Sequence, residues 1–125
     1  MNIEFIDLNP DRDFTFSSCV RAGDFIYTSH HGGSYNEDGD TIKGIEAQTE
    51  QCFKNLTKTL EVVGASLDDV VKTTVLLRNL EDFGPMREVY RRYFKNGYPA
   101  RTSFFTDFLD EGCLIQIDLV AYSPK

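Results

Sequence analysis

The most informative part of the sequence for the fold is residues 45–77, which read IEAQTEQCFKNLTKTLEVVGASLDDVVKTTVLL. Its first half carries apolar side chains at helical spacing, with charged and polar ones mostly on the other side, which predicts an amphipathic helix beginning at Ile45. These apolar residues are Ile45, Cys52, Phe53, Leu56, Leu60 and Val63. Gly64 is well placed just after the helix, where a left-handed conformation favours glycine. The following Ser-Leu-Asp-Asp predicts a short helical bend, and the β-branched run Val70–Leu77 predicts a strand buried on at least one face.

On the N-terminal side of this stretch, the pattern CVRAGDFIYTS predicts a hairpin. Two apolar runs flank a turn in which Gly23 supplies the positive φ that tight hairpins need. We expect strands near 16–21 and 25–30. Residues 30–44 are rich in Gly, Asn and Asp, so they predict a loop.

On the C-terminal side, the sequence predicts a second helix that is capped by Asp82 and has Pro85 in its first turn. Its apolar stripe is Phe83, Met86, Tyr90, Tyr93 and Phe94, and Asn96, Gly97 and Pro99 end it. Strands follow at 102–106 and 114–122, joined by a turn.

This element order, ββαβαββ, predicts an α+β fold for one domain, residues 1–125, with both helices on one face of a single sheet. The last strand is apolar on its second face too, which would leave a large exposed patch on a monomer. We therefore expect a homo-oligomer that buries this face. The alternative is a monomer with a half-solvated sheet, because Gln116 and Asp118 interrupt the second face.

The composition excludes several classes of protein. The net charge is −7, with 20 acidic against 13 basic residues, which disfavours binding to a nucleic-acid backbone. No apolar run approaches the roughly 20 residues that span a membrane, and the N-terminus does not resemble a signal peptide. Three widely spaced cysteines indicate free thiols and a cytoplasmic protein. His30 and His31 are neighbours on opposite faces of a strand end, so we expect no metal site.

The sequence contains little catalytic machinery. It has no nucleophile motif and no phosphate-binding loop. Two charged residues of the last two strands remain: Arg101, in the segment YPARTSFF, and Asp118, inside an apolar strand. A carboxylate there must be paired or hydrogen-bonded. It is either a structural partner of a nearby group or an acid/base or water-positioning group in a cleft, and the residues alone leave both open.

Residues 45–94, followed by PARTS at 99–103 and LIQIDLVAY at 114–122, resemble the Rid family of reactive intermediate deaminases, also named the endoribonuclease L-PSP family. The likeness runs from about Phe16 to Tyr122. It implies a fold like that of chorismate mutase and a homotrimer in which the sheets form a central barrel, with three clefts between subunits. The implied activity is hydrolysis of small 2-imino acids to 2-keto acids and ammonia, without a cofactor.

The resemblance also implies roles for individual residues. Arg101 would grip the substrate carboxylate, which suits a planar guanidinium. Asp118 would take the place of the family's water-orienting glutamate, and its side chain is one methylene shorter. The main-chain carbonyl of Ser103 would help to hold that water.

Other positions depart from the family pattern. Phe16 stands where many deaminating members have a tyrosine, and His30 follows Ser29 where a glycine is usual. Arg87 replaces an asparagine; it either adds a second positive charge to the cleft, favouring a dicarboxylate or larger anion, or is a solvated helix residue. The departures leave a second hypothesis, a trimeric small-carboxylate-binding or regulatory protein without turnover. An RNA-cleaving activity, suggested by the name of some relatives, is disfavoured by the net charge.

Overall fold

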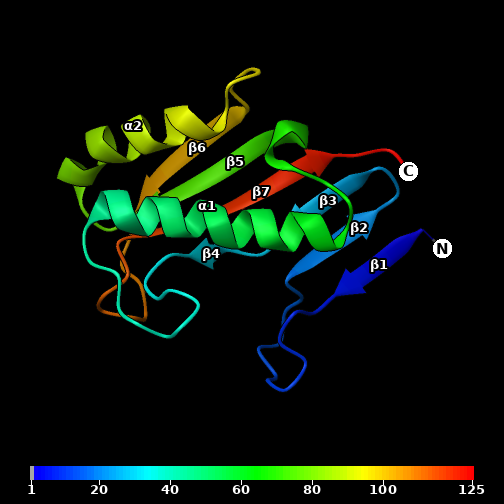
Figure 1. The fold of residues 1–125 in the computed structure, drawn as a ribbon, viewed down its shortest axis with the longest axis horizontal. Coiled ribbons are helices and arrows are strands. Elements are labelled where there is room, and N and C mark those ends of the chain that lie inside the picture. Colours follow the sequence, from blue (N-terminus) through cyan, green and yellow to red (C-terminus); the bar gives the residue numbers. More distant parts are fainter. Residues whose placement is uncertain (1) are drawn as a thin grey trace.

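Two helices cover one face of a seven-stranded sheet in the computed structural model, which describes residues 2–125 (Figure 1). The helices are α1 (Ile45–Val62) and α2 (Phe83–Tyr93). The strands are β1 (Ile3–Ile6), β2 (Cys19–Ala22), β3 (Phe25–Thr28), β4 (His31–Gly32), β5 (Val70–Leu77), β6 (Ala100–Phe105) and β7 (Ile115–Tyr122). Across the sheet they run β1-β2-β3-β7-β5-β6, and β4 also pairs with β7. The predicted α+β architecture is confirmed.

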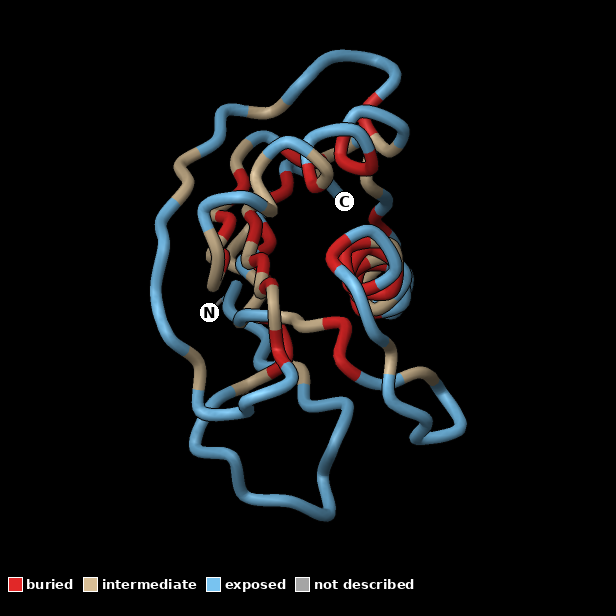
Figure 2. The backbone as a smooth tube through the Cα atoms, turned by 90° about the vertical axis from the view of Figure 1, so that its left-hand side faces the viewer, coloured by how far each residue is buried: buried red, intermediate tan, exposed pale blue. Residues whose placement is uncertain are grey.

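The apolar stripe of α1 forms the centre of the core. Phe53, Leu56 and Leu60 are fully buried, and Figure 2 shows the buried segments gathered between this helix and the sheet. Gly64 follows the helix with φ of 75°, as predicted. The predicted bend is a 3₁₀ turn at Leu67–Asp69 with a capping box on Ser66. Within residues 2–125, no helix combines the length and the apolar character needed to cross a membrane.

The two faces of the sheet differ in what covers them. In β7, Ile115, Ile117 and Leu119 are buried under the helices, whereas the alternate residues are half-buried or exposed. We call the uncovered side the open face. Its exposed large apolar side chains are Ile3, Phe5, Phe25, Tyr27, Phe104 and Tyr122. An apolar surface of this kind is typical of an interaction surface.

Two strands were not predicted. β1 pairs with β2 at one edge of the sheet, and β4 lies inside the expected loop 30–44, where it pairs with β7. Both are too short to show a strong alternating pattern. Their hydrogen-bonding partners come from distant parts of the chain, so the local sequence did not reveal them.

Three predicted boundaries need correction. β2 begins at Cys19, not near residue 16, so Phe16 lies in the preceding loop. β6 begins at Ala100, which places Arg101 inside the strand and not before it. Asp82 makes no capping hydrogen bond to α2, because it lies in a 3₁₀ turn, Leu80–Asp82, that leads directly into the helix.

Candidate functional site

Arg101 lies on β6 and faces α2. In the parallel pairing of β5 and β6 it stands beside Thr73, which is buried under the helices. Its guanidinium carbon lies 5.0 Å from the centre of the Tyr90 ring and 5.4 Å from that of Phe83. Within residues 2–125 the Arg101 side chain has no hydrogen-bond or ion-pair partner. Its charge is therefore positioned by two aromatic rings and free to meet a ligand.

Tyr90 is a fixed platform for this guanidinium. Its ring is buried, and its hydroxyl lies 2.7 Å from the hydroxyl of Thr73. Burial raises the pKa of Tyr90, although the Thr73 hydrogen bond and the charge of Arg101 act in the opposite direction. The phenol therefore stays neutral at physiological pH and supports the cation without pairing with it.

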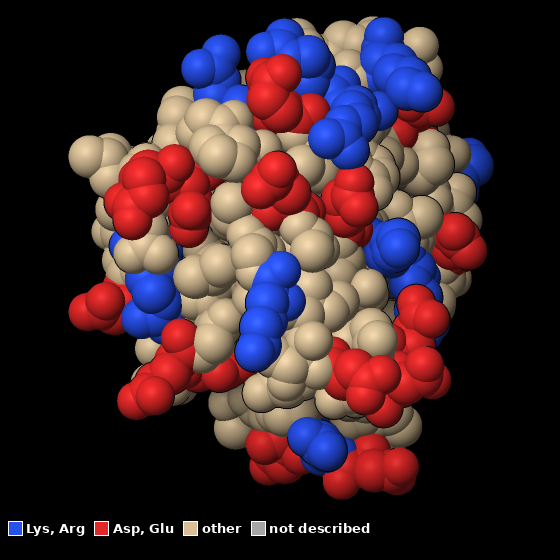
Figure 3. Space-filling view, turned by 60° about the vertical axis from the view of Figure 1, so that its left-hand side comes forward, with Lys and Arg blue, Asp and Glu red and all other residues tan. Residues whose placement is uncertain are grey.

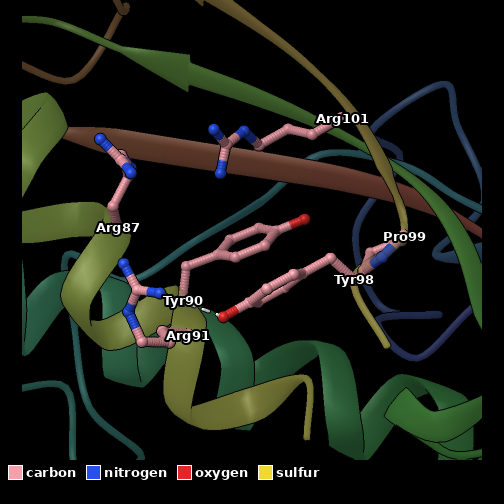
Figure 4. A pocket seen from close by; sticks show the side chains of 6 residues that line it. All are labelled: Arg87, Tyr90, Arg91, Tyr98, Pro99 and Arg101. Atoms are coloured by element: carbon pink, nitrogen blue, oxygen red, sulfur yellow. Dashed lines mark hydrogen bonds between the residues drawn. The ribbon is translucent and has the colours of Figure 1, made fainter. Parts of the chain in front are cut away.

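A pocket of about 290 Å³ opens at this guanidinium (Figure 4). We call it the arginine pocket; it is lined by Arg87, Tyr90, Arg91, Tyr98, Pro99 and Arg101. Arg91 lies 3.4 Å from the Glu88 carboxylate and 3.3 Å from the Tyr98 hydroxyl. Arg87 lines this pocket and is exposed, so both of the roles that the sequence left open for it remain possible.

A second hollow lies around Phe16, in the loop before β2, and His30. Their rings are 5.2 Å apart, and Phe14 stacks on Phe16 at 5.6 Å. We call this hollow the Phe16 cleft; it comprises two adjoining cavities of about 190 and 680 Å³. Phe14, Phe16, His30, Gly32 and Asn55 border both cavities, Ser29 and His31 border the smaller, and Gln116 borders the larger. No residue of the arginine pocket lines this cleft.

The family model described as endoribonuclease L-PSP matches residues 8–123, which include both the arginine pocket and the Phe16 cleft. The chain belongs to the endoribonuclease L-PSP family. This confirms the resemblance seen in the sequence, because the YjgF, RutC and Rid proteins belong to this same family.

Three relatives illustrate the family. A RutC family protein of Pyrococcus abyssi is 39% identical over 86% of this chain and 85% of its own length. The human 2-iminobutanoate/2-iminopropanoate deaminase is 35% identical over 85% of this chain and 78% of its own. The crystal structure of RidA from an Antarctic Psychrobacter is 31% identical, superposes with a TM-score of 0.82, and is matched over 98% of both chains.

His31 anchors the loop that carries His30 in this family member. Its Nδ1 lies 2.9 Å from the Ser29 carbonyl, to which it donates, and its Nε2 lies 2.8 Å from the Thr59 hydroxyl. Burial lowers the pKa of His31, which favours the neutral ring. His31 is thus a structural residue, whereas His30 is exposed and borders the Phe16 cleft.

The structure separates Asp118 from Arg101. Asp118 stands beside Thr74 and Arg101 beside Thr73, and neighbouring residues of a strand point to opposite faces. Asp118 is half-buried on the open face, and the hydrogen bond or ion pair expected for its carboxylate is not present within residues 2–125. The polar residue of β7 that borders the Phe16 cleft is Gln116, which sequence reasoning did not select as a site residue.

Ser103 lies two residues after Arg101 and so points to the same face of β6 as Arg101. Its hydroxyl is buried and has no hydrogen-bond partner within residues 2–125. A buried hydroxyl without a partner is unusual in a folded protein. The predicted role of Ser103 concerns its main-chain carbonyl and stays a prediction.

Proposed function

We propose that this protein hydrolyses reactive 2-imino acids to 2-keto acids and ammonia. The observation that carries the proposal is the unpaired guanidinium of Arg101, held over Tyr90 and Phe83 at the mouth of a small pocket. A carboxylate is the natural partner of such a group, since it accepts two parallel hydrogen bonds from a guanidinium. The 35% identity to a human protein named for deamination of 2-iminobutanoate and 2-iminopropanoate supports the same reaction.

The reaction requires little from the protein beyond the positioning of the substrate and a water molecule. Arg101 holds the carboxylate beside the imine carbon, and a water molecule adds to that carbon. The water gives up its protons to the imine nitrogen, the carbon–nitrogen bond breaks, and ammonia leaves as the keto carbonyl forms. Fixing the imine carbon next to a bound water removes the entropic cost of bringing the two together, and no cofactor is needed.

We further propose that the reaction takes place in clefts between copies of the chain, arranged as a homotrimer. The arginine pocket and the Phe16 cleft share no residue, which supports a site that combines the pocket of one copy with the cleft of another. The exposed apolar side chains of the open face support assembly, because burying them between copies is favourable. The free thiols of Cys19, Cys52 and Cys113 are consistent with the proposed cytoplasmic location.

In this arrangement we assign the water-orienting role on β7 to Gln116 in place of Asp118. The position of Gln116 at the Phe16 cleft supports this choice, since Asp118 borders neither cavity of the cleft. We expect Gln116→Leu to lower the rate of keto-acid formation by about tenfold or more, because the attacking water loses its hydrogen-bond partner. Asp118→Asn, which preserves shape, should change the rate by less than about twofold. If Asp118→Asn lowered the rate more than Gln116→Leu, the water-orienting role would belong to Asp118.

Mixing two impaired variants tests both the reaction and its location between copies. Arg101→Ala and Gln116→Leu chains are refolded together, and keto-acid formation from an enzymatically generated imino acid is compared with that of each variant alone. Random assembly leaves about a quarter of the clefts with both intact residues if each cleft draws on two copies. We expect activity to recover to about that level. If the site lay within one chain, mixing would restore nothing.

A non-catalytic carboxylate-binding protein is the second candidate, and Phe16 is the observation that favours it. A phenylalanine cannot donate a hydrogen bond to a substrate or a water, and His30 packs against it at 5.2 Å. Arg101-dependent binding of a 2-keto acid without acceleration of imine hydrolysis would support this candidate.

A further inference from the structure

The arginine pocket carries more positive charge than a monocarboxylate needs. Three of its six lining residues are arginines, and none is acidic. Arg91 is paired with Glu88 outside the lining, at 3.4 Å. Arg87 and Arg101 have no hydrogen-bond or ion-pair partner within residues 2–125. The pocket therefore contains two unneutralised guanidinium groups.

These two guanidinium groups lie against the same aromatic ring, that of Phe83. The Phe83 ring centre lies 5.7 Å from the guanidinium carbon of Arg87 and 5.4 Å from that of Arg101, so both cations contact one ring. Figure 4 shows both side chains extending into the same space above Tyr90. Two like charges in one pocket repel each other, and a bound anion offsets this repulsion. One small carboxylate gripped bidentately by Arg101 leaves Arg87 without a partner.

The placement of Arg87 follows from its position on α2. Arg87, Tyr90 and Arg91 are spaced three and four residues apart, so they share one flank of the helix. That flank faces Arg101 on β6 across the pocket. Arg92, one residue further on, turns away and pairs with Glu50 of α1 at 2.8 Å. The same short helix thus provides a pocket arginine and a matched arginine outside the pocket.

The arginine pocket is positively charged although the chain as a whole is acidic. The chain has a net charge of −7, and its overall field repels anions. In Figure 3, several Lys and Arg side chains lie along the upper edge of the molecule, where α2 lies, with acidic side chains between and below them, and further basic and acidic side chains are scattered over the rest of the view. Binding of a doubly charged anion by this protein requires local positive charge of this kind.

From these observations we propose that the preferred substrate is a 2-imino dicarboxylic acid, with Arg101 binding the carboxylate beside the imine carbon and Arg87 binding the distal one. This inference rests on the proposed deaminase function and adds its substrate class. The volume of about 290 Å³ suits a small diacid, since it lies at the lower end of the range for ligand pockets. Arg87 is then a specificity-determining residue.

The test compares two imines formed in the assay by an amino-acid oxidase: the imine of glutamate, which is a dicarboxylate, and 2-iminobutanoate, which is not. We expect wild-type kcat/KM to be about tenfold or more higher for the dicarboxylate. Arg87→Gln should lower that preference at least about tenfold, by a larger loss on the dicarboxylate than on 2-iminobutanoate. The control Arg92→Gln should keep the wild-type ratio. Equal losses on both substrates in Arg87→Gln, or no preference in the wild type, would overturn the inference.

A binding measurement separates failure of this inference from failure of the proposed function. Calorimetry with the stable 2-keto acids 2-oxoglutarate and 2-oxobutanoate needs no turnover. If the wild type hydrolyses neither imine but binds 2-oxoglutarate about tenfold more tightly, and Arg87→Gln loses that difference, the deaminase proposal fails while the dianion site stands. If 2-iminobutanoate is hydrolysed and the two keto acids bind equally, the deaminase stands and the dianion site fails.

Discussion

Replacing Arg101 by alanine is expected to lower kcat/KM for imine hydrolysis by about 100-fold. The substrate loses a bidentate, charge-assisted contact and, with it, the fixed position of the imine carbon next to the attacking water. Arg101→Lys keeps the charge but not the planar fork, so we expect an intermediate loss of about tenfold. Steady-state rates of keto-acid formation, with a generating enzyme in excess, give both values.

The same substitution should leave the fold intact. Arg101 is exposed and makes no hydrogen bond or ion pair within residues 2–125, so its removal costs only its contacts with the Tyr90 and Phe83 rings. Such contacts at an exposed site are worth about 1 kcal/mol or less each. Urea unfolding of Arg101→Ala should therefore remain close to that of the wild type. A variant that loses both activity and most of its stability would show that Arg101 acts through the fold and not on the substrate.

The largest expected effect on stability is that of Gly33→Ala. A Cβ atom at Gly33 would lie 1.9 Å from the main-chain oxygen of Gln48 and 2.9 Å from the main-chain nitrogen of Cys52. Both atoms belong to the backbone of α1, so no side-chain rotation relieves the clash. We expect the free energy of unfolding to fall by about 3 kcal/mol or more, or the protein not to fold. The midpoint of urea unfolding measures the change.

Gly84→Ala provides the matched control for this prediction. Gly84 lies in α2, and a Cβ atom there meets nothing within 4 Å. Alanine is the better helix former, so Gly84→Ala should be neutral or raise stability by up to about 1 kcal/mol. If Gly33→Ala were as well tolerated as Gly84→Ala, the close approach of residue 33 to α1 described here would be wrong. The loop of His30 and the Phe16 cleft would then lie further from the helix.

The parts of the fold that follow from local sequence were predicted well. The helical period from Ile45 and the β-branched run Val70–Leu77 each lie within one segment and match the structure. β1 and β4 were missed because their pairing depends on backbone hydrogen bonds to β2 and β7, and no side-chain pattern in two or four residues encodes those partners. Asp82 is of a residue type that often caps helices, but it lies in a 3₁₀ turn that removes the capping geometry.

The candidate site was predictable only in part. Arg101 could be selected from its segment, but the rings that hold it come from the apolar stripe of α2, which the sequence identified only as the apolar face of a helix. Alternation along β7 shows that Gln116 and Asp118 share a face, yet it does not show which of them borders a cleft. That is decided by the short strand β4, whose Gly32 pairs with Gln116.

The most direct test of the central claim is the rate of keto-acid formation from an enzymatically generated 2-imino acid, measured against the concentration of added protein. We expect a rate that rises in proportion to the concentration of wild-type protein, and a slope for Arg101→Ala that is about 100-fold smaller. A flat line for the wild type with both mono- and dicarboxylic imines would contradict the deaminase function. Equal slopes for wild type and Arg101→Ala would contradict the role of Arg101 as the carboxylate anchor.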